Sequence, residues 1–204
     1  MPFAIITDSS ANLPEATIEH YGLHVFGLVF NIDGEVHRSY IKGSITDLKQ
    51  FYTMLREGKV ITTSLPSLTE VEAIVRGVLE SGQDAIYIGF DSALSGTYEN
   101  TSRFLYSLRD ADFPDRKLYC VDSLGAALGQ GLLVIEACRK REAGDSVDQV
   151  AAWAEANRQR FAHWFTVDDL SYLQRGGRLS KGVAIAATLL NIKPVLHVDE
   201  EGRL

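Results

Sequence analysis

Residues 85–97 of the chain have the sequence AIYIGFDSALSGT, an apolar run that changes into a short polar loop. The run Ala85–Phe90 has the length of a buried strand, and a helix is expected to follow from about Thr97 to Arg109. The loop between them brings serine and threonine hydroxyls next to Gly96. A strand, a loop and a helix in this order form one βα unit, which predicts a parallel sheet.

The same order recurs through the first three quarters of the chain. Further apolar strands are expected at residues 3–7, 23–33 and 117–121, and one of the helices between strands is expected from about Ala127 to Glu142. Continuous apolar strands separated by helices are typical of a parallel sheet that is covered on both faces. The predicted fold class is therefore α/β, with a Rossmann-like parallel sheet in an N-terminal domain.

Three helices carry clearer signals. Ser67–Glu70 and Ser146–Gln149 have the spacing of capping boxes, with serine at the cap and Glu or Gln three residues later. A third helix is predicted to have one buried face, because its apolar residues recur at i, i+3, i+4 and i+7. These residues are Leu48, Phe51, Tyr52 and Leu55.

The pattern changes after Phe161. A strand, two helices and a strand are expected at residues 163–167, 170–174, 181–190 and 192–198. The last strand has no returning partner in the sequence, so its edge would stay unpaired. We therefore expect a parallel α/β domain over residues 1–160 and the start of a second, truncated α/β domain over residues 161–204.

Composition and charge argue against several classes of function. The formal net charge of −7 over 204 residues disfavours binding to nucleic acid and to anionic membranes. No apolar run approaches the roughly 18–20 residues that span a bilayer, and the N-terminus lacks the basic segment of a signal peptide. We expect a soluble, cytoplasmic protein with no nucleic acid partner and no membrane insertion.

The cysteines and histidines form no recognisable metal or redox motif. Cys120 and Cys138 lie in apolar segments outside any CxxC pair and are expected to be buried, reduced thiols. His20, His24 and His37 are not expected to form a cluster with carboxylates that would bind a metal, so no metal site is predicted.

Hydroxyl side chains cluster where the expected strands end and helices begin, at residues 8–10, 62–64, 92–97 and 122–123. In an open parallel sheet all four junctions would lie at the carboxyl ends of the strands, where ligands bind. A helix start also offers unpaired N–H donors and a partial positive charge, which favour an anion. The simpler interpretation of Ser95 is a helix cap, with Gly96 as a turn residue.

Five motifs, in order along the chain, resemble those of the DegV family. They are Ile6–Pro14, Thr63–Ser67, Leu94–Tyr98, Tyr172–Arg178 and Asn191–Pro194. One difference is Leu65, where the family usually has glutamine. The resemblance spans the whole chain, so it is specific.

The resemblance implies a protein that is not itself an enzyme. Such a protein binds a long-chain fatty acid and presents it to a separate fatty acid kinase, which phosphorylates the carboxylate. By match to the motifs, Thr63 and Ser95 would bind the carboxylate, assisted by backbone N–H groups near Gly96. Arg178 would serve kinase docking or phosphotransfer. The fatty acid is the ligand, and no cofactor is expected.

The resemblance also implies an apolar tunnel for the acyl chain between two domains. Residues 161–204 would then be the start of an incomplete, lipid-covering domain, with Ala184–Leu190 along the tunnel, although the same residues fit an ordinary core helix. Family members continue beyond the position of Leu204 and contribute a later histidine near the head group.

Other functions stay open from the residues alone. A serine-dependent ester hydrolase would need Ser95 in a G-x-S-x-G turn with a histidine base; the first glycine is missing, although His163 and His197 are present. A nucleotide site would need a glycine-rich loop, whereas Gly125–Gly131 is predicted to be a helix interior. A structural or interaction module with no ligand is a further interpretation.

Overall fold

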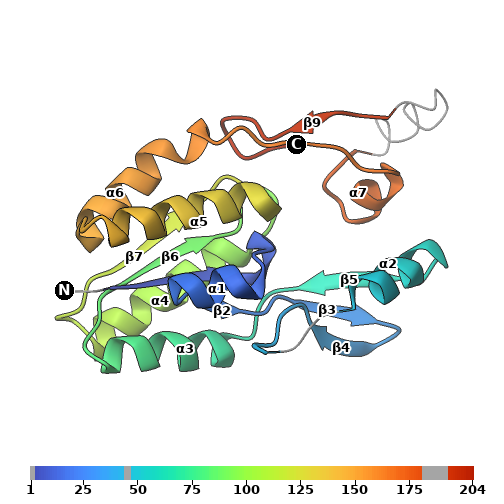
Figure 1. The fold of residues 1–204 in the computed structure, drawn as a ribbon. Helices are drawn as coiled ribbons and strands as arrows, with labels where there is room; N and C mark the ends of the chain where they lie inside the picture. The colour runs from blue at the N-terminus through green and yellow to red at the C-terminus, as the bar shows by residue number, and fades with distance from the viewer. Residues whose placement is uncertain (1–2, 44–46, 181–192) are drawn as a thin grey trace.

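A central sheet of four parallel strands organises the computed structural model, which describes residues 3–43, 47–180 and 193–204 (Figure 1). Its strands follow the order β2-β1-β6-β7. They are β1 (Ala4–Asp8), β2 (His24–Phe26), β6 (Ala85–Gly89) and β7 (Leu118–Asp122). Every residue of β1 and β6 is buried, as expected for strands covered on both faces. The predicted α/β fold class is confirmed.

Helices cover both faces of this sheet (Figure 1). Ile5, Ile86 and Ile88 pack on one side against α1 (Glu15–Tyr21), α5 (Ala127–Glu142) and α6 (Val147–Asn157). Ile6 and Tyr87 pack on the other side against α3 (Leu68–Glu80) and α4 (Thr97–Asp112). Each fully buried large apolar side chain contributes about 1.5–3 kcal/mol to folding. Two apolar layers therefore hold the strand ends in place.

A second sheet is antiparallel and was not predicted. The single strand expected at residues 23–33 is divided into β2 and β3 (Val29–Ile32). The division occurs at Gly27, where a Cβ atom would lie only 2.7 Å from the carbonyl oxygen of Tyr40. The next residue, Leu28, donates its N–H to Ser9 Oγ at 2.9 Å instead of continuing a ladder. The close approach of the backbone thus separates the two sheets.

The antiparallel sheet has the order β4-β3-β5, with β4 at Glu35–Arg38 and β5 at Ile61–Ser64. Thr63 lies opposite Phe30 in this ladder. The prediction that the junction at residues 62–64 lies on the carboxyl edge of the parallel sheet is therefore wrong. The other three junctions do follow β1, β6 and β7.

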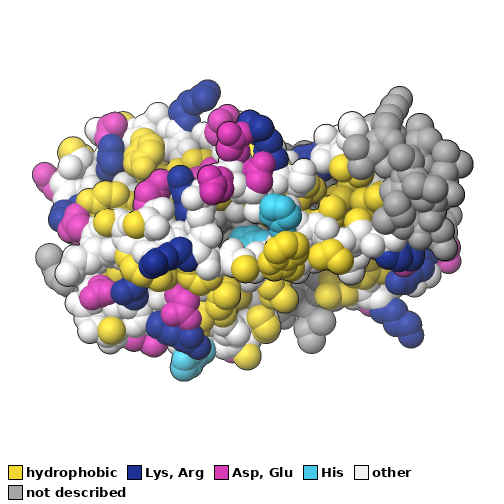
Figure 2. Space-filling view, turned by 90° about the horizontal axis from the view of Figure 1, so that it is seen from above, with side chains coloured by type: hydrophobic (Ala, Val, Ile, Leu, Met, Phe, Trp, Pro, Cys, Tyr) yellow, Lys and Arg dark blue, Asp and Glu magenta, His cyan; other side chains and the backbone are white. Residues whose placement is uncertain are grey.

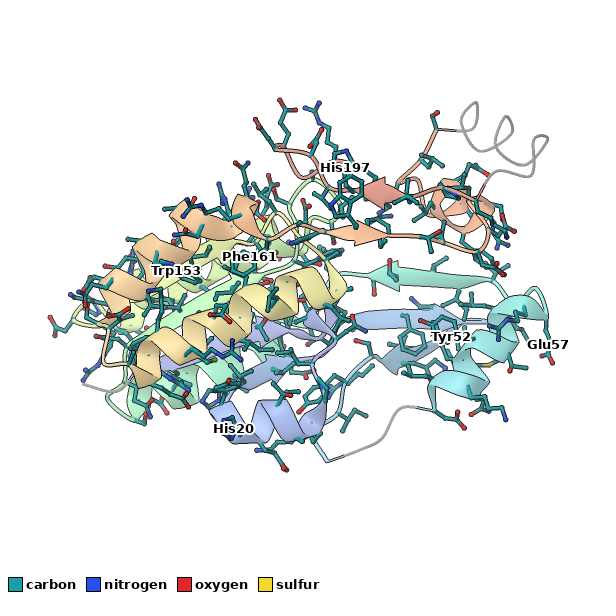
Figure 3. All side chains as sticks on the ribbon, turned by 45° about the horizontal axis from the view of Figure 1, so that its top comes forward. His20, Tyr52, Glu57, Trp153, Phe161 and His197 are labelled. Atoms are coloured by element: carbon teal, nitrogen blue, oxygen red, sulfur yellow. The ribbon has the colours of Figure 1, made fainter. Side chains whose placement is uncertain are left out.

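Helix α2 (Leu48–Arg56) forms where expected, but its predicted buried face is wrong, because none of its residues is buried. Leu48 is 57% exposed and Tyr52 is 51% exposed. Phe51 contacts Phe30 of the antiparallel sheet edge-on, with ring centroids 5.4 Å apart. Tyr52 lies at the end of the molecule opposite Trp153 and Phe161 (Figure 3).

The two predicted capping boxes differ in outcome. In α6, Ser146 and Gln149 exchange the expected bonds. In α3, Ser67 makes no side-chain cap bond. Glu70 instead pairs with Arg38 of β4 at 3.3 Å. A tertiary ion pair has thus replaced the predicted capping hydrogen bonds.

The last described segment forms an antiparallel strand pair, β8 (Trp164–Phe165) and β9 (Leu196–His197), with the short helix α7 (Ser171–Arg175) between them in sequence. Three-residue 3-10 helices precede it at Arg158–Arg160 (η2) and follow β1 at Ser9–Ala11 (η1). β8 and β9 pair with each other, so each has one neighbouring strand in this two-stranded sheet. The helix predicted at residues 181–190 lies outside the described residues. The division at residue 160 stays a prediction.

Both cysteines are free and buried, as predicted, Cys120 on β7 and Cys138 on α5. Burial raises the pKa of each thiol to about 12, so neither is a thiolate at neutral pH.

Candidate functional site

The loop between β6 and α4 holds Ser95 at the start of a 16-residue helix. The N–H groups of Leu94 and Ser95 donate to the carbonyl oxygen of Asp91 at 3.2 and 3.1 Å. Ser95 Oγ lies 2.9 Å from Thr97 Oγ1 and accepts the N–H of Thr97 at 3.2 Å. Ser95 therefore makes a cap-like bond, while Gly96 is the capping residue by backbone position.

The start of α4 suits an anion. Gly96 has no side chain to supply the usual cap bond. The first-turn N–H groups have no intrahelical acceptor, and of these Thr97 donates to Ser95 Oγ. The aligned peptide dipoles add a partial positive charge there. Ser95 is partly buried and Gly96 is exposed, so a ligand can approach from outside.

Thr63 approaches this loop from the other sheet. Its side chain is exposed and makes no hydrogen bond to the described residues. The strand that carries it leads into Leu65, and a Cβ atom on Gly96 would lie 3.8 Å from Leu65 Cδ2. The segment after Thr63 is thus adjacent to Gly96. The joint role of Thr63, Ser95 and Gly96 stays a prediction.

An apolar pocket of about 600 Å³ begins beside the same loop. It extends between the first turns of α5 and the β8–β9 strand pair, with walls that include Phe90, Leu94, Leu128, Leu132, Phe165 and Leu173. Figure 2 shows hydrophobic side chains gathered across the middle of this face, beside histidine side chains. Leu128 is 68% exposed and Trp164 is 67% exposed. The pocket is therefore open to solvent beside Leu128 and Trp164 in the part of the chain that the structure describes.

Among the described residues that line this pocket, His163 and Arg178 are the only ones with ionisable side chains. The His163 ring fills space left by two glycines, since a Cβ atom on Gly125 would lie 2.8 Å from its Nδ1 and one on Gly129 would lie 2.6 Å from its Nε2. Nδ1 is buried with no hydrogen-bonding partner in the described ranges. Burial lowers the pKa of His163, so the ring is neutral at pH 7.

The predicted helix interior at Gly125–Gly131 is found from Ala127 onward, because α5 begins there; Gly125 lies before the helix, so that end of the prediction is wrong. Sequence reasoning treated His163 only as a possible base. The four-residue spacing of Gly125 and Gly129 was the available signal for a bulky neighbour. His197 is exposed on β9, with its ring 5.2 Å from that of Trp164 (Figure 3).

Arg178 is exposed, but its Nε donates to the carbonyl oxygen of Leu94 at 2.9 Å. It thus contacts the residue directly before Ser95. In the same segment, Tyr172 donates its hydroxyl to the carbonyl oxygen of Leu55 at 3.1 Å. The predicted fourth motif therefore reaches both α2 and the Ser95 loop.

The first motif, Ile6–Pro14, includes a buried hydrogen-bond network centred on Asp8. Asp8 is fully buried. Its Oδ2 accepts the hydroxyl of Tyr87 and the N–H of Phe90, each at 3.0 Å. Its Oδ1 accepts the N–H of Ser10 at 3.1 Å and also the Ser10 hydroxyl. The Ser10 hydroxyl also lies within hydrogen-bonding distance of Gln130 Oε1, at 2.6 Å. This network ties the end of β1 to the start of the Ser95 loop.

Other chemistry has less support from the geometry. The hydroxyl of Ser95 pairs with Thr97 and with no histidine or carboxylate in the part of the chain that the structure describes. Among those residues, no group of three or more His, Cys, Asp or Glu side chains is arranged to hold a metal ion. None of the described helices has the length and apolar character needed to cross a membrane.

Comparison with known proteins identifies a matching family and a similar relative. The family model described as "Uncharacterised protein, DegV family" matches residues 2–204. A DegV domain-containing protein of Clostridium perfringens is 40% identical over 203 residues, which cover 99% of this chain and 69% of that protein.

Two solved structures are similar over nearly the whole chain. A DegV family protein from Thermus thermophilus, described as fatty-acid-binding, gives a TM-score of 0.82 at 32% identity and covers 100% of this chain and 69% of its own. A protein from Eubacterium ventriosum, described as binding stearic acid, gives a TM-score of 0.84 at 26% identity and covers 98% and 68%, respectively.

Proposed function

Because this chain belongs to the DegV family, we propose that it binds a long-chain fatty acid by its carboxylate and buries the acyl chain in the apolar pocket. Two similar proteins are described as binding fatty acids, one of them stearic acid. The observation that carries the proposal is the position of the pocket: it begins at Leu94, next to Ser95 at the start of α4.

The pocket supplies affinity for the acyl chain. Its volume of about 600 Å³ lies within the range of sites that enclose small ligands. Each buried CH₂ group contributes about 0.8 kcal/mol, so a long acyl chain gains most of its binding free energy there. The walls between Phe90 and Leu173 are apolar, which suits a saturated chain.

The head group needs donors, because an anion without hydrogen bonds is costly at a partly buried site. Ser95 Oγ would turn from Thr97 to the carboxylate, and the N–H groups at the start of α4 would complete the shell. The Thr63 hydroxyl would join from β5, where it is exposed and unpaired among the described residues. No cofactor takes part.

We further propose that the protein presents the bound acid, in the cytoplasm, to a fatty acid kinase and does not catalyse the phosphorylation itself. The kinase would transfer a phosphoryl group to the carboxylate. Arg178 supports this proposal, because it is exposed and lies beside the Ser95 loop. A guanidinium at the mouth of the site suits docking to a phosphate-handling partner.

The test of binding is mass spectrometry of a denatured extract of the purified protein, followed by titration of the delipidated protein with stearate. We expect one fatty acid per chain. An extract without stoichiometric lipid, together with no binding of added stearate, would refute the proposal.

The two roles are separated by substitution. Arg178→Ala should retain lipid and lose kinase-dependent phosphorylation, whereas Ser95→Ala and Thr63→Ala should each weaken lipid binding. Lipid loss from Arg178→Ala with normal binding by Ser95→Ala would mean that the roles are reversed.

A further inference from the structure

Asp91 is a fully buried acid at the centre of the Ser95 loop. Its Oδ1 accepts the N–H of Ala93 at 2.8 Å. Its carbonyl oxygen accepts the N–H groups of Leu94 and Ser95, and its own N–H donates to the carbonyl oxygen of Gly125 at 3.2 Å. The path of the backbone from β6 to Ser95 therefore depends on this one residue.

The second carboxyl oxygen of Asp91 lacks a hydrogen-bond donor among the described residues. Oδ2 is buried and has no hydrogen-bonding partner among residues 3–43, 47–180 and 193–204. Gly202 covers the carboxyl group so closely that a Cβ atom there would overlap Oδ1 and lie 2.9 Å from Oδ2. An ionised oxygen in this position is costly, because it gains neither water nor a donor from the protein.

The charged groups around Asp91 are mostly acidic. Asp122 on β7 accepts the N–H of Ser92 at 3.3 Å, and Asp199 lies on the turn that carries Gly202. Burial, with further contributions from Asp122 and Asp199, raises the pKa of Asp91 to about 6.

The basic groups nearby are engaged elsewhere. Arg158 on η2 donates to the carbonyl oxygen of Asp122 at 2.9 Å and pairs with Glu155 at 3.0 Å. Arg203 pairs with Glu201. His163, next to Gly125, is neutral at pH 7, because burial lowers its pKa. None of these supplies Asp91 with a hydrogen bond.

We propose that Asp91 is a positioning residue of the carboxylate site and takes up a proton from solvent when an anionic fatty acid binds beside Ser95. This inference rests on the proposed function. Asp91 lies four residues before Ser95, and its backbone carbonyl oxygen accepts the Ser95 N–H. A carboxylate bound at Ser95 therefore adds a like charge near the Asp91 carboxyl group, whose Oδ2 lacks a partner among the described residues. Protonation removes that repulsion without loss of the bond to Ala93.

The sign of the linkage follows from the free protein. With a pKa of about 6, Asp91 is mostly ionised at pH 7, and a neighbouring anion raises this pKa further. Between the free and bound values, binding takes up protons. Affinity for the anion should therefore fall as the pH rises from 6 to 8, by about twofold to fivefold for a coupling of roughly 0.5–1 pKa unit.

The experiment is calorimetric titration of delipidated full chain with sodium dodecanoate below its micelle concentration, at pH 6, 6.5, 7 and 8. Two buffers of different ionisation enthalpy report the number of protons taken up. We expect about a quarter to half a proton per bound acid near pH 6.5 for the wild type. Asp91→Asn, which keeps an acceptor for Ala93, should show a flatter affinity profile and little uptake. Titration of the ligand itself is common to all variants.

Asp91→Ser is the second variant, because a serine hydroxyl can also accept the Ala93 N–H. Asp148→Asn is the control for a change of charge, since Asp148 lies on α6 and pairs with Lys117; it should behave as wild type. No proton uptake by the wild type, or the same pH profile in wild type and Asp91 variants, overturns this inference alone. No dodecanoate binding by wild type at any pH refutes the proposed function as well.

Discussion

The carboxyl ends of β1 and β6, two neighbouring strands of the parallel sheet, both carry a buried aspartate, but the two carboxylates are satisfied very differently. Asp8 receives bonds from Tyr87, Phe90 and Ser10 on both of its oxygens. Asp91 receives a side-chain bond only from Ala93, and its other oxygen has no partner in the described segments.

The difference shows how similar residues at equivalent positions serve different purposes. A fully bonded buried carboxylate is a structural tie, because charge-assisted bonds offset its loss of water. A partly bonded one is sensitive to any charge that arrives nearby. Only the second lies in the loop that carries Ser95 and borders the apolar pocket.

The largest effect on stability should come from removing the Asp8 carboxylate and its hydrogen bonds. Asp8→Ala leaves the Tyr87 hydroxyl and the Phe90 N–H buried without their acceptor, so we expect a loss of about 3–5 kcal/mol in the free energy of unfolding. Urea denaturation measures it. Asp148→Ala, at an exposed salt bridge, is the matched control and should change stability little. Equal losses in both variants would mean that the Asp8 network is not a tie.

The next effect compares ligand binding after a serine is removed from each loop, Ser95 after β6 and Ser10 after β1. Ser95→Ala should weaken stearate binding by about ten- to a hundredfold, because the carboxylate loses a donor worth roughly 1.5–3 kcal/mol. The matched variant is Ser10→Ala, which loses the hydroxyl contacts to Asp8 and Gln130 and should lower stability by about 1 kcal/mol while leaving affinity nearly unchanged. Titration and denaturation of both variants check the pair. The comparison fails if Ser10→Ala weakens binding as much as Ser95→Ala.

A smaller effect concerns stability and pH. Burial raises the pKa of Asp91 from its ordinary value of 3.8 to about 6, so the folded state holds a proton that the unfolded chain has released. The free energy of unfolding should therefore fall as the pH rises from about 4 to 6 and change no further above that range. We expect about 1–2 kcal/mol, less than the full shift because of solvent screening. Asp91→Asn should lack this slope in urea denaturation at pH 4.5–8. A slope unchanged in the variant would assign it to other groups.

The smallest effect tests the contact between Asp91 and the last turn. Gly202 and Gly144 both have positive φ, +82° and +97°, so alanine costs about 1 kcal/mol of backbone strain at either. Only at Gly202 would the methyl group meet Asp91. Gly202→Ala should thus exceed Gly144→Ala by about 1 kcal/mol, and Asp91→Ser should relieve the excess. Identical thermal shifts for the two glycine variants would argue against the contact.

Local sequence patterns were sufficient for the parallel sheet and for much of the loop chemistry. Ala85–Phe90 carries no charged residue and is apolar along its length, as a strand covered on both faces requires. The order of strand, hydroxyl loop and helix placed Ser95 and Gly96 at a helix start. The motifs that resemble the DegV family supplied the ligand class, which chemistry at single residues did not.

Tertiary contacts decided the rest. The division of residues 23–33 at Gly27 depends on Tyr40, and the position of Thr63 depends on pairing with Phe30 across an antiparallel ladder. The isolation of Asp91 is set by Gly202, which lies 111 positions further along the chain (202 − 91). Periodicity along the chain reports which face of an element is apolar. It carries no information on which distant backbone will cover a given carboxylate, and that covering is what separates Asp91 from Asp8.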